Sequence, residues 1–459
     1  MTKLAARAQG EIPRTRTPDA GPRTPDPGPR TTIIFILLGA PLLMTSASLH
    51  LHFTLPDDRQ VHLRLNHEAL TISIDERLVY TFDRAGRLFG VFDRGVNIRR
   101  GLDGRMLARW RDDSGRRQRR WLTAEEREAL LATMRADVET VGRAQAVRER
   151  TGMFEMVNRA LAFDEKADVR RFHQVYRPIS ILPPDQYQAL VLQATEGCSF
   201  NTCTFCALYR DRPFRIKSPA EFQRHVTDVL DFFGPGVSMR RSIFLADANA
   251  LIIPQRRLLP LMTIVARTFP ILPEDADAAV RRQWLRRDPR AMTGVFAFVD
   301  GLSAERKGVA DWRAMRALGL RRVYIGLESG HEPLLAWLRK PSTAAEMIDA
   351  VGRMKEAGLH VGVIVLLGAG GRRFDAGHVR DTAAALNAMP LDDGDIIYFS
   401  PFQPDPAAPY LSIARAEGVD LPDDAFMAAQ RRRILAQLTL PLPPAGPKRV
   451  PYNLADFVY

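Results

Sequence analysis

The pattern of apolar and polar positions changes near residue 186, and the chain beyond it has the form of repeated strand-helix units. Short continuous apolar runs alternate with amphipathic stretches, which is typical of a parallel sheet covered by helices and joined by right-handed crossovers. Six units are too few to close an eight-stranded barrel. We therefore expect an α/β fold, an open, partial (β/α)6 TIM-like barrel over residues 186–405, with strands at 189–195, 242–247, 294–300, 322–328, 361–368 and 395–401.

The residues before this barrel follow a different period. From about 50 to 110, apolar and polar residues alternate in short runs separated by Asp, Arg and Gly, which predicts a β-meander domain over residues 44–122. A helical linker is expected over 123–185, where Thr123 and Glu126 have the spacing of a capping box. Residues 406–459 are predicted to form a C-terminal helical extension, with a helix at 423–438.

Residues 1–43 carry no pattern on which a fold can be built. Residues 1–30 are rich in Pro, Thr and Arg, which is typical of disorder. The apolar run at 33–44 contains Gly39 and Pro41 and is shorter than the roughly 20 residues that a membrane helix needs. The segment resembles a secretory signal, but we favour a start at Met44, or an extension without function, over export.

The net charge of the chain raises the question of a nucleic-acid partner but does not answer it. The 459 residues carry a formal net charge of +12, with an apolar content of 46% that is ordinary for a globular protein. Residues 99–120 contain nine Arg and three Asp, with Trp110 inside the stretch and Trp121 next to it. Interleaved basic and aromatic residues suit a nucleic-acid platform, whereas a charged run is usually a solvated face. Both interpretations remain open.

All three cysteines of the chain lie in one segment, as Cys198, Cys203 and Cys206 in a C-x4-C-x2-C pattern just after the first predicted strand. An odd, tightly grouped set argues against a disulfide framework and for a thiolate-ligated metal in a reducing compartment, hence the cytoplasm. A structural zinc site needs a fourth protein ligand, and His225 lies in a predicted helix without ligand-type spacing to the cysteines. Three thiolates on a [4Fe-4S] cluster leave one iron free to bind another molecule.

The segment "TEGCSFNTCTFCALYRDRPFRIKS" resembles the cluster loop of the radical S-adenosylmethionine (radical SAM) superfamily. Phe205 stands where that superfamily usually has an aromatic residue, while its usual spacing, C-x3-C-x2-C, is one residue shorter. The resemblance implies a [4Fe-4S] cluster held by the three cysteines, and S-adenosylmethionine cleaved reductively to a 5′-deoxyadenosyl radical. That radical would remove a hydrogen atom from an unknown substrate, with an external electron donor such as flavodoxin or ferredoxin as partner.

The same resemblance implies further cofactor contacts at other strand ends. Glu328 and Ser329 in "YIGLESG" match residues that contact the ribose or methionine part of the cofactor, and Gly368 and Gly370 match a backbone approach to adenine. Where the superfamily has a Gly-Gly-Glu-like turn, this chain reads "ADANA", so Asp247 or Asn249 would accept from the cofactor's ammonium group. Taken singly, such glycines are most often turn formers and such an acid a solvent-facing loop residue.

Two alternatives to a simple one-cluster enzyme are kept. The first is an RNA-modifying radical SAM enzyme, and the second is a non-catalytic iron-sulfur or metal-binding protein. No cysteine is left for a second cluster, and the sequence has no Asp-x-His-x-x-Gly segment of the kind that base-off cobalamin binding uses. The catalytic residue stays unassigned, because Tyr209, Tyr324 and Tyr398 could each relay a hydrogen atom but strand tyrosines are more often packing residues.

Overall fold

The structure is a computed structural model that describes residues 48–459. The predictions for residues 1–43, including a start at Met44, lie outside these described residues. Among the helices in the described part of the chain, none combines the length and the apolar character needed to cross a membrane.

The first sheet is an antiparallel meander in which each strand pairs with the next along the chain. Apolar residues alternate with polar ones because one face is buried: in one strand Val61, Leu63 and Leu65 are buried while Arg64 is exposed. The predicted β-meander is thereby confirmed. Its strands are β1 (Leu49–Thr54), β2 (Gln60–Leu65), β3 (Ala69–Ile74), β4 (Leu78–Asp83), β5 (Leu88–Asp93), β6 (Val96–Arg100), β7 (Met106–Arg111) and β8 (Arg117–Trp121).

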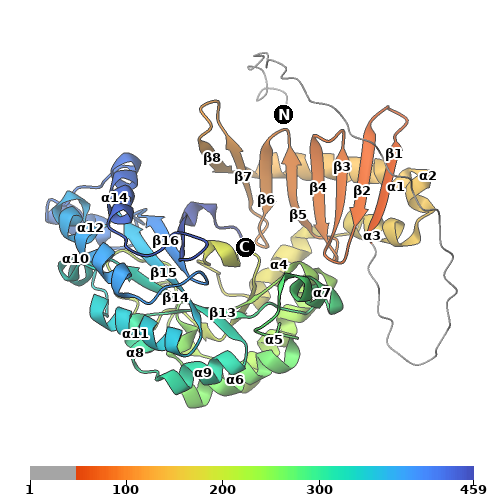
Figure 1. Cartoon of the computed structure of the whole chain (residues 1–459). Helices are drawn as coiled ribbons and strands as arrows, with labels where there is room; N and C mark the ends of the chain where they lie inside the picture. The colour runs from red at the N-terminus through yellow and green to blue at the C-terminus, as the bar shows by residue number, and fades with distance from the viewer. Residues whose placement is uncertain (1–47) are drawn as a thin grey trace, which may run out of the picture. The chain divides into compact units, whose positions relative to one another are not determined.

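Helices pack on the buried face of this sheet, as Figure 1 shows for the longest of them. That helix starts at a capping box: the Thr123 hydroxyl accepts the Glu126 N–H and the Glu126 carboxylate accepts the Thr123 N–H. Its buried side chains, such as Met134 and Val138, share a core with the sheet. The helices of this part are α1 (Ala124–Arg143), α2 (Gln145–Arg148), α3 (Thr151–Leu161) and α4 (Glu165–Val175).

The second sheet is parallel, with strand order β17-β16-β15-β14-β13-β12-β9. Its six strands from β9 to β16 are largely buried on both faces, which explains their continuous apolar sequences. All six predicted strands are present, as β9 (Leu190–Gln193), β12 (Ile243–Ala246), β13 (Val295–Val299), β14 (Leu320–Glu328), β15 (His360–Leu367) and β16 (Ile396–Pro401). In the described residues, β17 (Lys448–Pro451) adds a seventh.

The added strand, β17, falls in the segment that the sequence predicts as helical extension. Its four residues include a single aliphatic side chain, Val450, so it lacks the apolar run that identifies the other strands. It pairs with β16 alone and forms one edge of the sheet, while β9 forms the other. An edge position tolerates the polar residues that a central parallel strand excludes.

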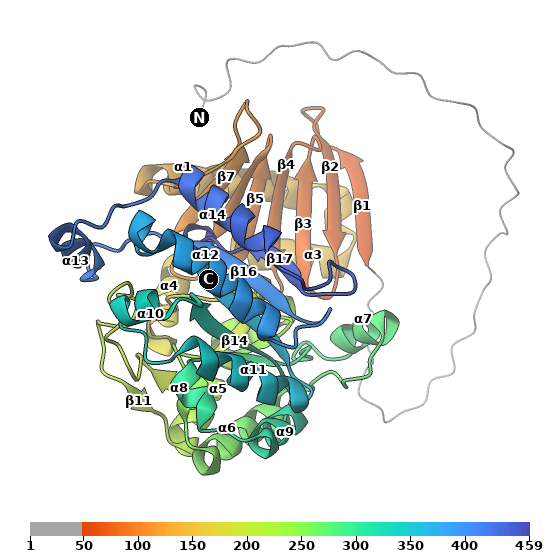
Figure 2. The ribbon, with the colours of Figure 1, turned by 60° about the vertical axis from the view of Figure 1, so that its left-hand side comes forward.

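Helices follow the strands and cover the parallel sheet. Figure 2 shows α12 (Gly371–Ala388) and α14 (Asp424–Ala436) lying over β16. Ser218 caps its helix, with Pro219 at the first helical position and Glu221 completing a capping box. The helices of this part are α5 (Pro219–Phe233), α6 (Gln255–Thr268), α7 (Ala278–Arg287), α8 (Gly301–Glu305), α9 (Val309–Ala317), α10 (Glu332–Trp337), α11 (Ala344–Glu356), α12 (Gly371–Ala388), α13 (Tyr410–Ala416) and α14 (Asp424–Ala436).

Candidate functional site

The three cysteines lie in a loop whose two ends are held together as a short ribbon. After β9 the chain forms β10 (Thr195–Glu196), which pairs antiparallel with β11 (Arg215–Ile216). Residues 197–214 between these strands contain all the thiols. Because β9 is one strand of a parallel sheet, the loop starts at the carboxyl edge of the sheet, where βα loops place reactive groups.

Asp247, at the end of β12, ties this loop to the sheet. Its carboxylate accepts the Gly197 N–H at 3.2 Å and the Arg212 guanidinium at 2.9 Å, so it joins the two sides of the loop. Gly197 has φ +76°, and a Cβ there would lie 2.9 Å from the Pro213 carbonyl oxygen, so this start of the loop requires glycine. Burial raises the pKa of Asp247, and the charge of Arg212 acts against that rise.

Hydrogen bonds within the loop orient the sulfurs. The Asn201 N–H donates to Cys198 Sγ at 3.4 Å, and the Arg210 guanidinium donates to the carbonyl oxygens of Cys203 and Cys206 at 3.0 Å. Burial raises the pKa of the Cys203 thiol to about 11, against the opposing charge of Lys340. The pKa of Cys206 is raised by burial as well. A metal that binds these sulfurs must displace their protons.

The cysteines line a cavity of about 480 Å³, a size typical of sites for small ligands. Phe205, Asn249 and Glu328 line the same cavity, so the structure brings these three predicted cofactor residues together with the three predicted metal ligands. Much of the remaining wall is apolar, and includes Phe200, Phe298, Ile364, Leu366, Phe402 and Tyr452. The cavity therefore combines a few polar groups with largely apolar walls.

Glu328 and Lys340 form a buried ion pair at the cavity wall, with 2.9 Å between Oε1 and Nζ. Burial alone would lower the pKa of Lys340, but the charges of Glu328 and Cys203 reverse this, and the pKa is raised. Glu328 has φ +56°, a backbone conformation that few residues other than glycine adopt. Gly326 makes room for the pair, because a Cβ there would collide with the Glu328 carboxylate.

Asn249 presents a buried oxygen that has no hydrogen-bond partner among the described residues. Its amide group donates to the Asp300 carboxylate and to the Ser303 hydroxyl, which fixes the orientation of the side chain. Asp300 is itself fixed, because it accepts the Ser303 N–H as the N-cap of α8. A buried acceptor without a partner is uncommon in proteins, and here it belongs to a residue that lines the cavity.

The remaining predicted cofactor residues, like Asp247, are not among the residues that line the cavity. The Ser329 hydroxyl accepts the His331 N–H and bonds to His378 Nδ1, so Ser329 is committed to the helix layer. The N–H groups of Gly368 and Gly370 donate to Gln430 and Tyr410. A role for Asp247, Ser329, Gly368 and Gly370 in cofactor binding therefore stays a prediction.

The tyrosines considered as hydrogen relays divide in the same way. Tyr209 lines the cavity. Tyr324 and Tyr398 instead donate their hydroxyls to Asp185, each at 2.6 Å, at a segment that precedes β9. Lys340 is a site residue that the sequence does not indicate, because its ion pair with Glu328 is visible only in the fold.

His225, the residue considered as a fourth zinc ligand, serves a different role. It lies within α5, and its Nε2 atom accepts the Gln193 N–H at 3.0 Å. Burial lowers the pKa of His225 to about 3, so the ring stays neutral and available as an acceptor. His225 is not among the residues that line the cysteine cavity.

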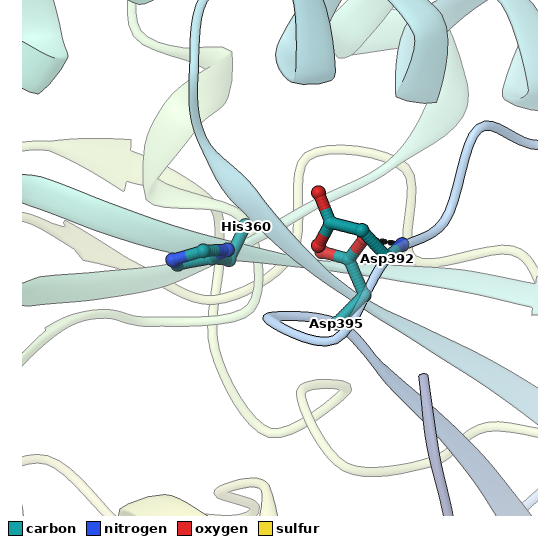
Figure 3. A group of neighbouring side chains, drawn as sticks. All are labelled: His360, Asp392 and Asp395. Carbon is teal, nitrogen blue, oxygen red and sulfur yellow. Dashed lines mark hydrogen bonds between the residues drawn. The ribbon is translucent and has the colours of Figure 1, made fainter. Parts of the chain in front are cut away.

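A second group with metal-ligand side chains, drawn in Figure 3, lies where β15 begins and just before β16, at the amino edge of the parallel sheet. His360 begins β15, and Asp392 and Asp395 lie in the loop before β16. Lys355 already provides the positive charge here, because its Nζ lies 2.7 Å from each of the two carboxylates. Asp395 also accepts the N–H groups of Val361 and Asp392. The two carboxylates of this partly exposed group are therefore already paired with a cation of the chain.

Of three comparisons with known proteins, only the search of solved structures finds similar chains. A scan against protein-family models finds no match, and neither does a search of curated proteins. A radical S-adenosylmethionine methyltransferase from Kitasatospora setae, solved with cobalamin and a [4Fe-4S] cluster, is 17% identical, with a TM-score of 0.36 over 53% of this chain and 41% of that one. This chain thus spans less than half of that protein.

Two further solved structures are similarly distant. Coproporphyrinogen III oxidase from Escherichia coli, described as a radical SAM enzyme, is 12% identical, with a TM-score of 0.38 over 60% of this chain and 55% of that one. Methylornithine synthase is 14% identical, with a TM-score of 0.34 over 63% of this chain and 79% of that one. At these values the likeness transfers neither a substrate nor a residue's role to this chain.

Proposed function

We propose that this protein is a radical SAM enzyme that cleaves S-adenosylmethionine reductively at a [4Fe-4S] cluster and acts on a substrate still to be identified. One observation carries the proposal: three cysteines in a loop at the carboxyl edge of a parallel sheet line a single cavity together with Glu328, Lys340 and Asn249. A non-catalytic iron-sulfur carrier has no need for a small-molecule cavity beside its cluster.

The residues present fit such a cluster. Cys198, Cys203 and Cys206 would ligate three of its irons, which leaves the fourth iron for the amino and carboxylate groups of the cofactor. When bound, the cluster supplies the electron that cleaves S-adenosylmethionine to methionine and a 5′-deoxyadenosyl radical, which then takes a hydrogen atom from the substrate. The Asn201 N–H at Cys198 Sγ is the kind of contact that tunes a cluster's potential.

The polar groups of the cavity match the charges of S-adenosylmethionine. Asn249 Oδ1, buried and unpartnered within the described residues, would accept a hydrogen bond from an N–H of the cofactor's amino group. The Lys340 ammonium would pair with the carboxylate, and Glu328 would then be released to accept from ribose hydroxyls. The aromatic walls would keep water away from the reactive carbon.

We infer that the parallel sheet curves into a partial barrel. Support comes from the residues that bridge its two edges: the Tyr459 hydroxyl accepts the N–H of Val191 in β9, and the Tyr452 hydroxyl, just after β17, donates to the Leu182 carbonyl. Edges that nearly meet would be linked in this way by a short segment.

Thiolate ligands also favour a reducing location such as the cytoplasm, with flavodoxin or ferredoxin as the electron donor.

The test is anaerobic reconstitution with iron and sulfide, followed by dithionite and S-adenosylmethionine. We expect about four iron atoms per chain, the broad visible absorption of an iron-sulfur cluster, and formation of 5′-deoxyadenosine. A chain purified with stoichiometric zinc would overturn the assignment of the metal. A stable cluster that produces no 5′-deoxyadenosine would favour the non-catalytic alternative.

A further inference from the structure

One face of the β7–β8 hairpin carries four arginines in a two-by-two array. The strand register places Arg109 opposite Arg119 and Arg111 opposite Arg117. Because alternate residues of a strand point to the same face, all four side chains share one face of the hairpin. Like charges directly opposite each other in a sheet are destabilising, so this face is held together in spite of its own repulsion.

The compensation for this charge is incomplete. Asp456, in the C-terminal segment, lies 3.6 Å from Arg119 and 4.0 Å from Arg109. Within residues 48–459, no carboxylate lies within ion-pair distance of Arg111 or Arg117, both of which are exposed. A single acid against four arginines leaves the face strongly positive.

The tip of the hairpin is built to hold these strands in register. The Asp112 carboxylate accepts the Ser114 hydroxyl, the Arg116 N–H and the Gln118 amide, so it is committed to the turn. The Ser114 and Gln118 hydrogen bonds lower the pKa of Asp112 to about 2, and it stays ionised there. The two strands that carry the arginines are therefore held in register before any ligand arrives.

An aromatic ring completes the face. Trp121 lies opposite Leu107, which places it on the same side of the hairpin as the four arginines. Its side chain is 40% exposed, and the Arg105 guanidinium lies 4.6 Å from its ring centroid. Exposed aromatic rings beside arginines are the platforms on which unpaired bases stack.

The array also lies beside residues of the cysteine cavity. Leu454 lines that cavity, and Asp456, two residues further on, contacts Arg109 and Arg119. Both belong to one turn of 3₁₀-helix, η4 (Leu454–Asp456). A polymer held on the hairpin would run close to the cavity wall.

We propose that this face, formed by Arg109, Arg111, Arg117, Arg119 and Trp121, binds single-stranded RNA. The arginines contact backbone phosphates, and the tryptophan stacks on a base. An anionic membrane would also attract arginines, but surface binding of that kind needs an apolar face to enter the lipid, and the array carries one aromatic ring. This inference stands whether or not the proposed cleavage of S-adenosylmethionine is correct.

The experiment measures binding of the purified full-length protein to a fluorescein-labelled single-stranded RNA by anisotropy, at several salt concentrations. An RNA of about 20 nucleotides suffices, since such sites span roughly 4 to 16. The double variant R111Q/R117Q removes two exposed charges whose loss should leave the fold intact. The matched control, R282Q/R286Q on α7, removes the same charge from two exposed arginines elsewhere.

We expect the R111Q/R117Q variant to bind about 25-fold more weakly near 0.1 M salt, because each phosphate contact contributes about fivefold there. The dependence of log affinity on log salt should flatten by about 1.4. The control should stay within about twofold of the parent. Trp121→Ala should weaken binding about fivefold or more without changing the salt dependence, because stacking releases no counterions.

Three results would overturn the proposal. The parent protein could fail to bind RNA at low salt, or the hairpin variant and the α7 control could lose affinity equally. The third is hairpin-dependent binding to phosphatidylserine vesicles without binding to RNA, which would identify a membrane surface as the partner. Thermal unfolding of each variant serves to show that a loss of binding is not a loss of fold.

Discussion

The two edges of the parallel sheet handle polar side chains in opposite ways. At the carboxyl edge, three thiols, the Glu328–Lys340 pair and an Asn249 oxygen that has no partner within residues 48–459 line one cavity. At the amino edge, Asp185 accepts Tyr324, Tyr398 and Arg322 at 2.6 to 2.9 Å. The carboxyl edge thus retains, within the described residues, a polar atom that can still bond a ligand, whereas Asp185 at the amino edge already accepts three hydrogen bonds.

The amino edge would be the easier one to misread. Its His360, Asp392 and Asp395 cluster has the residue types of a metal site, whereas the carboxyl edge shows three thiols with raised pKa values for Cys203 and Cys206. The two carboxylates of the amino-edge cluster are already paired with Lys355, so residue type alone does not identify a metal site.

Removing a thiol should give the largest effect on this contrast. Cys206→Ala leaves two sulfurs, too few to hold the proposed cluster, so we expect loss of visible absorption and at least a hundredfold loss of 5′-deoxyadenosine formation. Ser242→Ala, which removes a hydrogen bond to Gln186 at the amino edge, is the control and should retain iron. Iron analysis and product assay check both variants. Full activity in the Cys206→Ala variant would show that the three cysteines do not form the proposed site.

Lys340→Met should come next. It leaves Glu328 buried without its partner and removes the cation expected to meet the cofactor carboxylate. We predict about a hundredfold weaker binding of S-adenosylmethionine, measured by anaerobic equilibrium dialysis on reconstituted protein. Lys355→Met removes the same charge from the opposite edge and should leave this affinity unchanged. Equal losses in both variants would mean that Lys340 has no particular role in binding.

Asp185→Ala tests the amino edge through stability. Two buried tyrosine hydroxyls and one guanidinium lose their shared acceptor, so the free energy of unfolding should fall by about 3 kcal/mol. Urea denaturation measures the change. Binding of S-adenosylmethionine by the folded fraction should persist, and a selective loss of binding would mean that the two edges are coupled.

Gly326→Ala should give the smallest effect. The added methyl group collides with the Glu328 carboxylate, which should shift the ion pair and reduce the rate of S-adenosylmethionine cleavage by about tenfold. Gly352→Ala, in helix α11, meets no atom within 4 Å and should stabilise the fold by roughly 0.5–1 kcal/mol without a change in rate. Comparing the two rates in one assay separates a local clash from a general effect of losing glycine.

The sequence was a good guide to elements with a strong local signal. Continuous apolar runs located six strands, and the capping residue Thr123 located the start of a helix. It failed at β17, whose residues carry little apolar signal and are in a strand because β16 offers an open edge. Such a strand is created by its neighbour and leaves no period in the sequence.

Positions at strand ends could be predicted, but the directions of their side chains could not. Glu328 and Ser329 are adjacent in the sequence, yet the φ of +56° at Glu328 leaves one at the cavity and the other among helices. Lys340 was overlooked because its role depends on a partner in β14 and on a thiol in a distant loop. Contacts of this kind belong to the tertiary structure.

The composition of β17 also affects whether two copies of the protein can associate through this edge strand. A strand at the rim of a sheet presents unpaired backbone groups that can template association with another chain. Here that rim carries Lys448 and Arg449, whose charges repel an identical strand, and Pro451, which has no N–H to donate. The polar sequence that hid β17 from prediction thus discourages strand-by-strand aggregation at this side of the sheet.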